Sequence, residues 1–489
     1  MNLKVYLVNP PYKQFRLQRD MRWNDVGRGG TAYYPVWLAY ATGVLEQDGF
    51  QCRLVDAPAN EWDSFETIAD INNYGSDCVV IDTSFPSLKL DLAFVEELKS
   101  YYPRVKTIIV GAPAEPLKDK IMENKSVDYL ARLEFDFVLR DLMNSLLYGR
   151  DGSEVKGVSY RDSHGIVYHN PNREWSTRED LDSIPFVSSV YKEHLNLKDY
   201  ILNYSYALYP EVQIVTSRGC PARCTFCSWT ENLTGRIYRH RSVGNVLDEF
   251  EYVKKEMPEV RQIFIEDDSF TINKKYVMEF CQGYQDRKLK MPWGCQTRIE
   301  LDYETMVAMK KANCIHVDVG YESGSPDILR NIKKGITVED IRRFANDAHK
   351  ARLSVTGNWI IGLRGETKET IEDTRKLIKV TRADSLTVAV ASPFPGTAMY
   401  DWVKENNYLI KDNYLDEFGH QQAIMSYPGL SDSEMKQAVD KILRDYFVSV
   451  SYIPIAMKRI MSKNGFNEAM VLGKSAVAFL KYLIKEKAL

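Results

Sequence analysis

The stretch Val215-Thr216-Ser217-Arg218-Gly219-Cys220-Pro221-Ala222-Arg223-Cys224-Thr225-Phe226-Cys227 decides the fold of this chain. Its three cysteines follow a C-x3-C-x2-C spacing, and an aromatic residue precedes the third cysteine. Three thiolates can hold three irons of a [4Fe–4S] cube, whereas ordinary ferredoxins use four cysteines for each cluster. The spacing therefore predicts a cluster that is ligated by Cys220, Cys224 and Cys227 and has one open iron.

The residues before these cysteines predict a buried strand, because residues 211–216 are rich in β-branched and apolar side chains until Arg218-Gly219 ends the run. Barrel enzymes place their catalytic residues at the C-terminal ends of strands. A structural zinc site is the less favoured alternative. Zinc takes four ligands, and no second C-x2-C or H-x3-H pair follows.

This cysteine motif resembles that of the radical S-adenosylmethionine (SAM) superfamily. The resemblance implies that SAM binds the open iron through its amino and carboxylate groups. It implies that reductive cleavage of SAM gives a 5′-deoxyadenosyl radical, with an external electron donor of the flavodoxin or ferredoxin type. Phe226, the aromatic residue of the motif, becomes a predicted SAM contact.

A second predicted strand, which starts at Arg261, ends in Glu266-Asp267-Asp268. Unpaired charge is costly to bury, so three adjacent carboxylates at a buried strand end favour a cationic ligand. The run resembles the acidic motif that binds the SAM amino group in this superfamily. The resemblance assigns that contact to Asp267 and Asp268, and a helix N-cap at Asp268 is compatible with it.

Three further segments complete the predicted SAM site. Arg298, at the end of the strand 293–298, is expected to pair with the SAM carboxylate or with a neighbouring acid. The run Glu322-Ser323-Gly324-Ser325 resembles the segment that contacts the SAM ribose and carboxylate, which adds Glu322, Ser323 and Ser325. Lys333-Lys334-Gly335 is interpreted as a structural helix cap.

Residues 206–405 as a whole are predicted to form a partial (β/α)6 TIM barrel that is open on one side for a large substrate. The last of its strands are expected at 355–363 and 386–390. Residues 406–489 form a predicted C-terminal helical domain, with apolar-periodic helices at 434–446, 447–461 and 467–484.

Residues 1–147 alternate predicted strands and helices, and this βαβ rhythm predicts a doubly wound, Rossmann-like α/β domain. No G-x-G-x-x-G follows the first strand, so a dinucleotide site is not favoured. Ligands of such sheets bind outside the carboxyl ends of the strands. The predicted ligand contacts are Asn9, Asp56, Thr83, Ser84, Gly111 and Ala112.

The N-terminal region resembles the cobalamin-binding domain that precedes many radical SAM domains. The resemblance lies in residues 7–11, 35–39, 111–113 and 128–134. Some cobalamin proteins carry D-x-H-x-x-G, whose histidine ligates cobalt. Asp162-Ser163-His164 begins like this motif but continues with Gly165, so cobalt is expected without a histidine ligand. The alternative is a domain that keeps the fold and lacks the cofactor. Residues 148–205 are predicted to be a linker with a hairpin.

Over nearly its whole length the chain resembles the hopanoid-biosynthesis radical SAM enzymes that contract a sugar ring to a cyclitol ether, through residues 34–39, 54–58 and 134–137. The wider group includes C-methyltransferases and the anaerobic porphyrin ring cyclase. The predicted reaction is hydrogen abstraction from an unactivated carbon followed by C-methylation through methylcobalamin. The alternative is a rearrangement, ring contraction or cyclisation of a sugar- or lipid-linked substrate without methyl transfer. Methylthiolation of tRNA is disfavoured, because Cys52 and Cys78 cannot supply a second set of three cysteines.

Composition limits the possible partners. The 489 residues carry a formal net charge of only −3, so no global field favours nucleic acid. No apolar run approaches the ~18 residues of a membrane span. Eight cysteines, three of them clustered, suit a reducing cytoplasm. The expected partner is a small-molecule or lipid-linked substrate.

Overall fold

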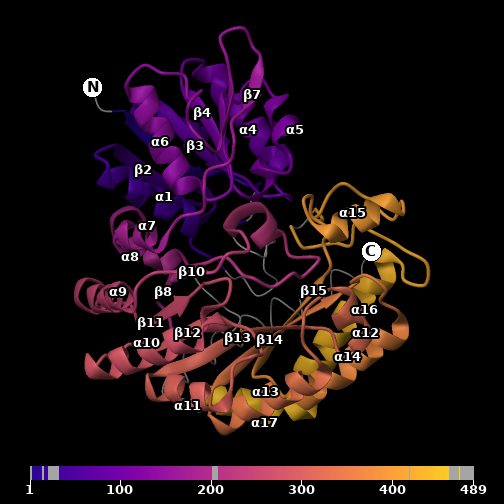
Figure 1. Ribbon diagram of the computed structural model, residues 1–489. Coiled ribbons are helices and arrows are strands. Elements are labelled where there is room, and N and C mark those ends of the chain that lie inside the picture. The colour runs from indigo at the N-terminus through magenta and orange to yellow at the C-terminus, as the bar shows by residue number, and fades with distance from the viewer. Residues whose placement is uncertain are drawn as a thin grey trace.

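The computed structural model describes residues 3–13, 16–19, 32–200, 208–417, 419–461 and 473. Two sheets organise these residues, one in the N-terminal part of the chain and one in the middle (Figure 1). Every helix of the described chain is too short or too polar to span a bilayer.

The first sheet has the strand order β2-β1-β3-β4-β5-β6-β7. Its strands are β1 Lys4–Asn9, β2 Gln51–Asp56, β3 Cys78–Asp82, β4 Lys106–Val110, β5 Tyr129–Ala131, β6 Val158–Arg161 and β7 Val167–His169. The strands β2-β1-β3-β4-β5 run parallel. This is the flavodoxin-like order, in which ligands bind where the connections switch sides, between β1 and β3.

Helices cover both faces of the first sheet, because side chains alternate along each strand. Val5 and Leu7 of β1 share a core with α1 (Val36–Gln47) and α6 (Phe135–Leu147). Tyr6 and Val8 point to the other face, where the core includes side chains of α3, α4 and α5. The bounds of these helices are Ser64–Tyr74, Leu88–Tyr101 and Lys118–Met122, and the short α2 spans Ala57–Asn60. The predicted doubly wound domain is confirmed.

The hairpin that the sequence predicts after this domain is formed by β6 and β7. It does not stand free, because β6 pairs antiparallel with β5 and extends the first sheet. Two helices follow, α7 (Arg178–Ser183) and α8 (Val187–His194), and α8 packs against α1. The segment predicted as a linker thus contributes two strands and a helix to the packing of the first domain.

The second sheet has six strands, all parallel, in the order β15-β14-β13-β12-β11-β8. They are β8 Glu211–Ile214, β11 Gln262–Ile265, β12 Trp293–Thr297, β13 Cys314–Glu322, β14 Ser354–Ile361 and β15 Ser385–Val390. The helices between them lie on its outer side (Figure 1): α9 Val243–Glu256, α10 Lys274–Asp286, α11 Tyr303–Lys311, α12 Pro326–Asn331, α13 Val338–Lys350 and α14 Lys368–Thr381. The predicted partial barrel is confirmed.

The C-terminal region adds α15 (Ala398–Glu405), α16 (Asp432–Phe447) and α17 (Ile453–Ile460). Helix α16 packs against β14, β15 and α14, so it closes the β15 side of the barrel. The helix predicted at 447–461 begins later than expected, because a 3-10 turn at Val450–Tyr452 separates α16 from α17. Pro454 then occupies the first turn of α17, where its missing N–H costs nothing. The helix predicted at 467–484 lies outside the described residues.

Candidate active site at the facing edges of the two sheets

The three cysteines follow β8 in a loop that is held at both ends. The short strand β9 (Ser217–Arg218) pairs with β10 (Arg239–His240), and the amide of Cys220 donates to the carbonyl of Gly235. Gly219 has a φ of +85°, and a Cβ there would lie 2.1 Å from the carbonyl oxygen of Ile237. Only glycine therefore fits directly before Cys220.

The loop between the cysteines is fixed to the far side of the barrel. The amide of Thr225 donates to the carbonyl of Ile332, and the amide of Met399 donates to the carbonyl of Thr225, both at 3.0 Å. These bonds tie the cysteines to the end of α12 and the start of α15. Phe226 is half-buried and packs against the main core beside Cys227.

The cysteine thiols lie among charged side chains. Cys220 and Cys224 are buried and Cys227 is half-buried. Burial raises the pKa of the Cys220 and Cys224 thiols, while the positive charges of Lys334 and Arg298 lower the pKa of Cys224. These cations favour the thiolate that iron binds.

Among the described residues, no three His, Cys, Asp or Glu side chains converge closely enough to hold a single metal ion. A cube needs a different arrangement, because each thiolate binds its own iron. Three cysteines on one glycine-positioned loop, next to two cationic side chains, fit a [4Fe–4S] cluster with an open iron. They do not have the convergent four-ligand geometry of structural zinc.

Asp267 and Asp268, the two predicted SAM-ammonium contacts, both hold the cysteine loop in place. Asp267 is fully buried and accepts hydrogen bonds from the amides and hydroxyls of Thr216 and Ser217 at 2.6–3.0 Å. Burial raises its pKa to about 6, against these hydrogen bonds. Asp268 accepts from the amide of Gly219 and the hydroxyl of Thr234, each at 2.7 Å. Their contact with SAM stays a prediction.

Glu266, the first acid of the run, lies on the opposite side of the strand from Asp267. Its carboxylate accepts hydrogen bonds from the side-chain amides of Gln213 and Gln296, at 3.1 and 3.2 Å. It is half-buried, between the buried Ile265 and Asp267. The sequence reasoning quoted Glu266 without assigning it. Strand alternation was the available signal, because residues 262, 264 and 266 share one face.

Arg298, Glu322 and Lys334 meet beside the cysteines. Arg298 donates to the carboxylate of Glu300 at 2.7 Å and to the carbonyl of Lys334 at 3.1 Å. The Lys334 ammonium lies 2.6 Å from the Glu322 carboxylate, and both side chains are buried. A Cβ on Gly320 would lie 2.4 Å from Glu322, so the glycine makes room for this pair. The sequence interpretation of Lys334 as a structural cap missed this position.

Ser323 and Ser325, also predicted to contact SAM, shape the turn after β13. The Ser323 hydroxyl lies 3.2 Å from that of Thr374, and it accepts from the amide of Ser325 at 3.2 Å. The amide of Gly324 donates to the Thr374 hydroxyl at 2.8 Å. The turn is thereby fixed to α14, and both serines are buried at the same strand ends as Glu322.

The six residues predicted to bind cobalamin gather at the carboxyl edge of the first sheet, and five of them are buried side chains in the described chain. Asn9 and Gln18 donate to the carboxylate of Asp56 at 2.8 and 2.6 Å. Thr83 donates to Asp91 at 2.7 Å, and Arg19 forms a fully buried ion pair with the same carboxylate at 2.7 Å. Sequence reasoning missed Arg19 and Asp91, because their pairing joins segments 72 residues apart.

The chemistry of this edge fits a cobalamin that receives no ligand from the protein. The edge offers hydroxyl and amide groups and small residues, including Gly111 and Ala112 at the end of β4. The described histidines of this domain lie elsewhere. His164 is in the β6–β7 turn, His169 contacts Asp119, and His194 contacts Glu46.

The carboxyl edges of the two sheets face each other. Phe85, just after β3, stacks on Phe394, just after β15, with ring centroids 4.9 Å apart. The 3-10 turn Ala112–Ala114 at the end of β4 packs against a π-helical turn, Thr230–Thr234, that follows the cysteine loop. A group bound at the first edge would therefore lie next to the cysteines.

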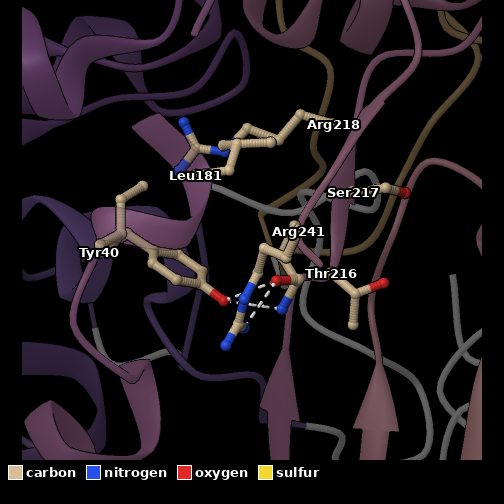
Figure 2. Close-up of a pocket in the computed structure, with 8 residues that line it drawn as sticks. Tyr40, Leu181, Thr216, Ser217, Arg218 and Arg241 are labelled. Atoms are coloured by element: carbon tan, nitrogen blue, oxygen red, sulfur yellow. Dashed lines mark hydrogen bonds between the residues drawn. The ribbon is translucent and has the colours of Figure 1, made fainter. Parts of the chain in front are cut away.

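Helix α1 also packs on the base of the cysteine loop (Figure 2). The Tyr40 hydroxyl donates to the carbonyl of Val215 at 3.0 Å, and Arg241 donates to the same carbonyl at 3.3 Å. With Arg218 these residues line a pocket of about 10 Å³, roughly the room that one water molecule needs. This pocket is too small for a cofactor, so it belongs to the interface between the domains.

Comparison with known proteins agrees with this arrangement. Residues 214–378 match the radical SAM superfamily, and residues 25–142 match the B12 binding domain. An uncharacterized methyltransferase of Pyrococcus horikoshii is 27% identical over 468 residues, covering 95% of this chain and 96% of the relative. The anaerobic magnesium-protoporphyrin IX monomethyl ester cyclase of Rubrivivax gelatinosus is 25% identical, covering 92% and 78%.

The structure of the radical SAM methyltransferase TsrM from Kitasatospora setae, with cobalamin and a [4Fe–4S] cluster bound, superimposes with a TM-score of 0.72. It is 15% identical and covers 100% of both chains, so the two proteins share the fold. The chain therefore combines a B12-binding domain with a radical SAM domain and is a radical SAM enzyme. These two domains imply a [4Fe–4S] cluster, SAM and cobalamin as its cofactors.

Proposed function

We propose that this enzyme is a C-methyltransferase that removes hydrogen from an unactivated carbon of its substrate and places a methyl group on that carbon. The observation that carries this proposal is the facing of the two carboxyl edges. The Phe85–Phe394 stack and the contact between residues 112–114 and 230–234 bring the B12-binding edge next to the cysteine loop. When bound, the cluster and SAM supply the hydrogen-abstracting radical, and cobalamin supplies the methyl group.

The residues of this chain divide that task. Cys220, Cys224 and Cys227 would hold the cluster. Glu266 is half-buried and held by two glutamine amides, which suits it to bind the SAM ammonium from the inner face of the barrel. Arg298 and Lys334 would attract the SAM carboxylate, as each points a cation toward the cysteines. Asp267 and Asp268 would act mainly by holding the loop, through the hydrogen bonds they accept from residues 216–219.

A second candidate is a rearrangement or cyclisation without methyl transfer. The similarity to the Rubrivivax cyclase over 92% of the chain favours it. We place it second, because the Pyrococcus relative named as a methyltransferase aligns over more of both chains. A flavodoxin or ferredoxin is proposed as the electron donor, in the cytoplasm.

Nucleoside analysis separates the two candidates. The anaerobically reconstituted enzyme would be incubated with SAM, a reductant, cobalamin and a cell extract as the source of substrate, and the nucleosides would be measured by mass spectrometry. Methyl transfer predicts S-adenosylhomocysteine together with 5′-deoxyadenosine. If 5′-deoxyadenosine rises with the extract while S-adenosylhomocysteine does not, the methyltransferase proposal is wrong and the second candidate stands.

A further inference from the structure

The second sheet carries a row of polar side chains on the face that its helices do not cover. Gln296, Asp318, Thr356 and Ser385 stand opposite one another in register on β12, β13, β14 and β15. Glu266 joins the row through its hydrogen bond from Gln296. We call these five residues the polar row. Asn358 and Thr387 face each other in the next layer, toward the cysteines.

The position of the polar row follows from strand alternation. Its sequence neighbours Ile265, Cys295 and Val317 are fully buried in the core shared with the outer helices. Glu266 and Gln296, by contrast, are partly exposed. Parallel barrels usually fill the inner face with valine, isoleucine and leucine. A row of carboxylates, amides and hydroxyls adds little to packing, because polar groups cost free energy to bury unless they are hydrogen-bonded.

The layer next to the polar row contains buried polar atoms that lack a partner among the described residues. Both carboxylate oxygens of Glu211 and the hydroxyl of Ser354 have no hydrogen bond, although both residues are more than nine-tenths buried. Glu211 precedes Gln213 by two residues on β8, and Ser354 precedes Thr356 by two on β14, so both lie on the inner face. Buried polar groups without partners indicate a missing polar ligand or water.

The charge of the polar row selects among ligands. It contains two carboxylates, Glu266 and Asp318, separated by the neutral Gln296. Adjacent strands are about 4.8 Å apart, so the two acidic positions are roughly 10 Å apart across β12. The nearby cations Arg298 and Lys334 lie at the cysteine end and have carboxylate partners of their own. An amine is favoured beside the polar row, whereas a phosphate or carboxylate is repelled.

Asp318 is the carboxylate best placed for a substrate. It is 5% exposed, and the Asn358 side-chain amide donates to its Oδ1, which fixes the plane of the carboxylate. It lies two strands from Glu266, so both carboxylates can bind cations at once. With Glu266 assigned to SAM, the second acidic position remains for the molecule that reacts.

We propose that Asp318, oriented by Asn358, binds a cationic amine of the substrate, which is therefore a small, water-soluble amine. This inference rests on the proposed function for the chemistry that follows binding. It differs from the lipid-linked substrate that the sequence leaves open, and from an anionic macrocycle. An acidic, amide-lined inner face offers neither of those molecules a complementary surface.

The test uses the full-length enzyme with cluster and cobalamin, and SAM with a trideuterated methyl group. A cell extract is divided into cation-exchange-retained, anion-exchange-retained and lipid fractions. Each fraction is assayed for stimulation of 5′-deoxyadenosine formation and for transfer of label. The proposal expects the cation-exchange-retained fraction to stimulate. Stimulation only by the other fractions, or by none, overturns it. Stimulation by the expected fraction without transferred label would refute methyl transfer and leave the amine site standing.

Variants then place the site at Asp318, with the active compound as substrate. Loss of one charge-assisted hydrogen bond in D318N should raise KM about ten- to a hundred-fold, with a smaller effect on kcat. D318E, which keeps the charge, should recover much of this loss. The control D327N removes an exposed carboxylate of α12 and should leave KM unchanged. If D318N and D318E both keep the wild-type KM, or if KM rises equally in both, the assignment to Asp318 fails.

Discussion

Arg218, two residues before the first cysteine, places its guanidinium 2.5 Å from the carboxylate of Asp136 on α6, and both side chains are almost fully buried. The same guanidinium lies 4.7 Å from the ring centroid of Trp37 on α1. The cysteine loop is therefore anchored to two helices of the B12-binding domain. A buried ion pair of this kind is expensive to break, because removing one partner leaves an unpaired charge inside the protein.

We expect the D136N variant to lose about 3 kcal/mol of stability, near the lower end of the usual cost, because Glu134 remains 3.9 Å from Arg218. The thermal unfolding midpoint should fall, and so should the iron retained after anaerobic reconstitution. Both are measured on the same sample by calorimetry and iron analysis. The matched control is D141N, which alters a partly exposed carboxylate on the same helix and should change stability by less than about 0.5 kcal/mol. Equal effects of D136N and D141N would contradict the anchoring role.

The glycine before the first cysteine provides a second test. In G219A the new Cβ would lie 2.1 Å from the carbonyl oxygen of Ile237, so the cysteine loop must shift. We expect the variant to fold, with unchanged far-UV circular dichroism, and to lose most of its iron–sulfur absorbance. G165A is the control, because Gly165 has a similar φ of +84° with nothing within 4 Å of its Cβ. It should pay only the cost of backbone strain and keep its cluster.

The strands and most helices of this fold could be predicted from the sequence, because their signals are local. Alternating apolar runs identified β3 (Cys78–Asp82) and α4 (Leu88–Tyr101) with their observed bounds. The strand order 2-1-3-4-5 could not be predicted, since a βαβ rhythm does not state which strands become neighbours. The place of the β6–β7 hairpin at the edge of the first sheet depends on the same long-range pairing.

The cysteine motif was evident from the sequence because its spacing alone carries the chemistry. The roles of individual acids were not evident, because Asp267 and Glu266 are adjacent in sequence and their side chains point to opposite sides of the strand. Lys334 was missed for a related reason. Its partner Glu322 is twelve residues away, and only the turn after β13 brings the two together.

The cluster ligands can be tested with substitutions that leave the fold intact. Replacing Cys220, Cys224 and Cys227 together by alanine should abolish the iron–sulfur absorbance of the reconstituted protein and the cleavage of SAM. Alanine at the half-buried Cys52, in β2 of the first domain, is the control and should change neither. A cluster that persists in the triple variant would overturn the assignment of all three ligands.

The buried carboxyl of Glu366 makes the stability of the barrel depend on pH. Glu366 accepts from the amides of Gly362 and Leu363 in the turn after β14, and burial raises its pKa to about 8. The folded protein therefore keeps this proton up to a higher pH than the unfolded chain. Between the ordinary glutamate pKa and about pH 8, the folded state binds more protons, so the stability that this group contributes falls as pH rises.

We expect E366Q to remove this dependence, because glutamine keeps an acceptor oxygen and has no proton to lose. The thermal midpoint of E366Q should exceed that of the wild type increasingly from about pH 5 to about pH 8.5, by an amount on the order of a few kcal/mol at the upper end. E369Q gives the opposite sign, because a hydrogen bond with the Thr367 side chain lowers the pKa of the exposed Glu369. A constant difference between E366Q and the wild type across this range would show that Glu366 titrates as it does in the unfolded chain.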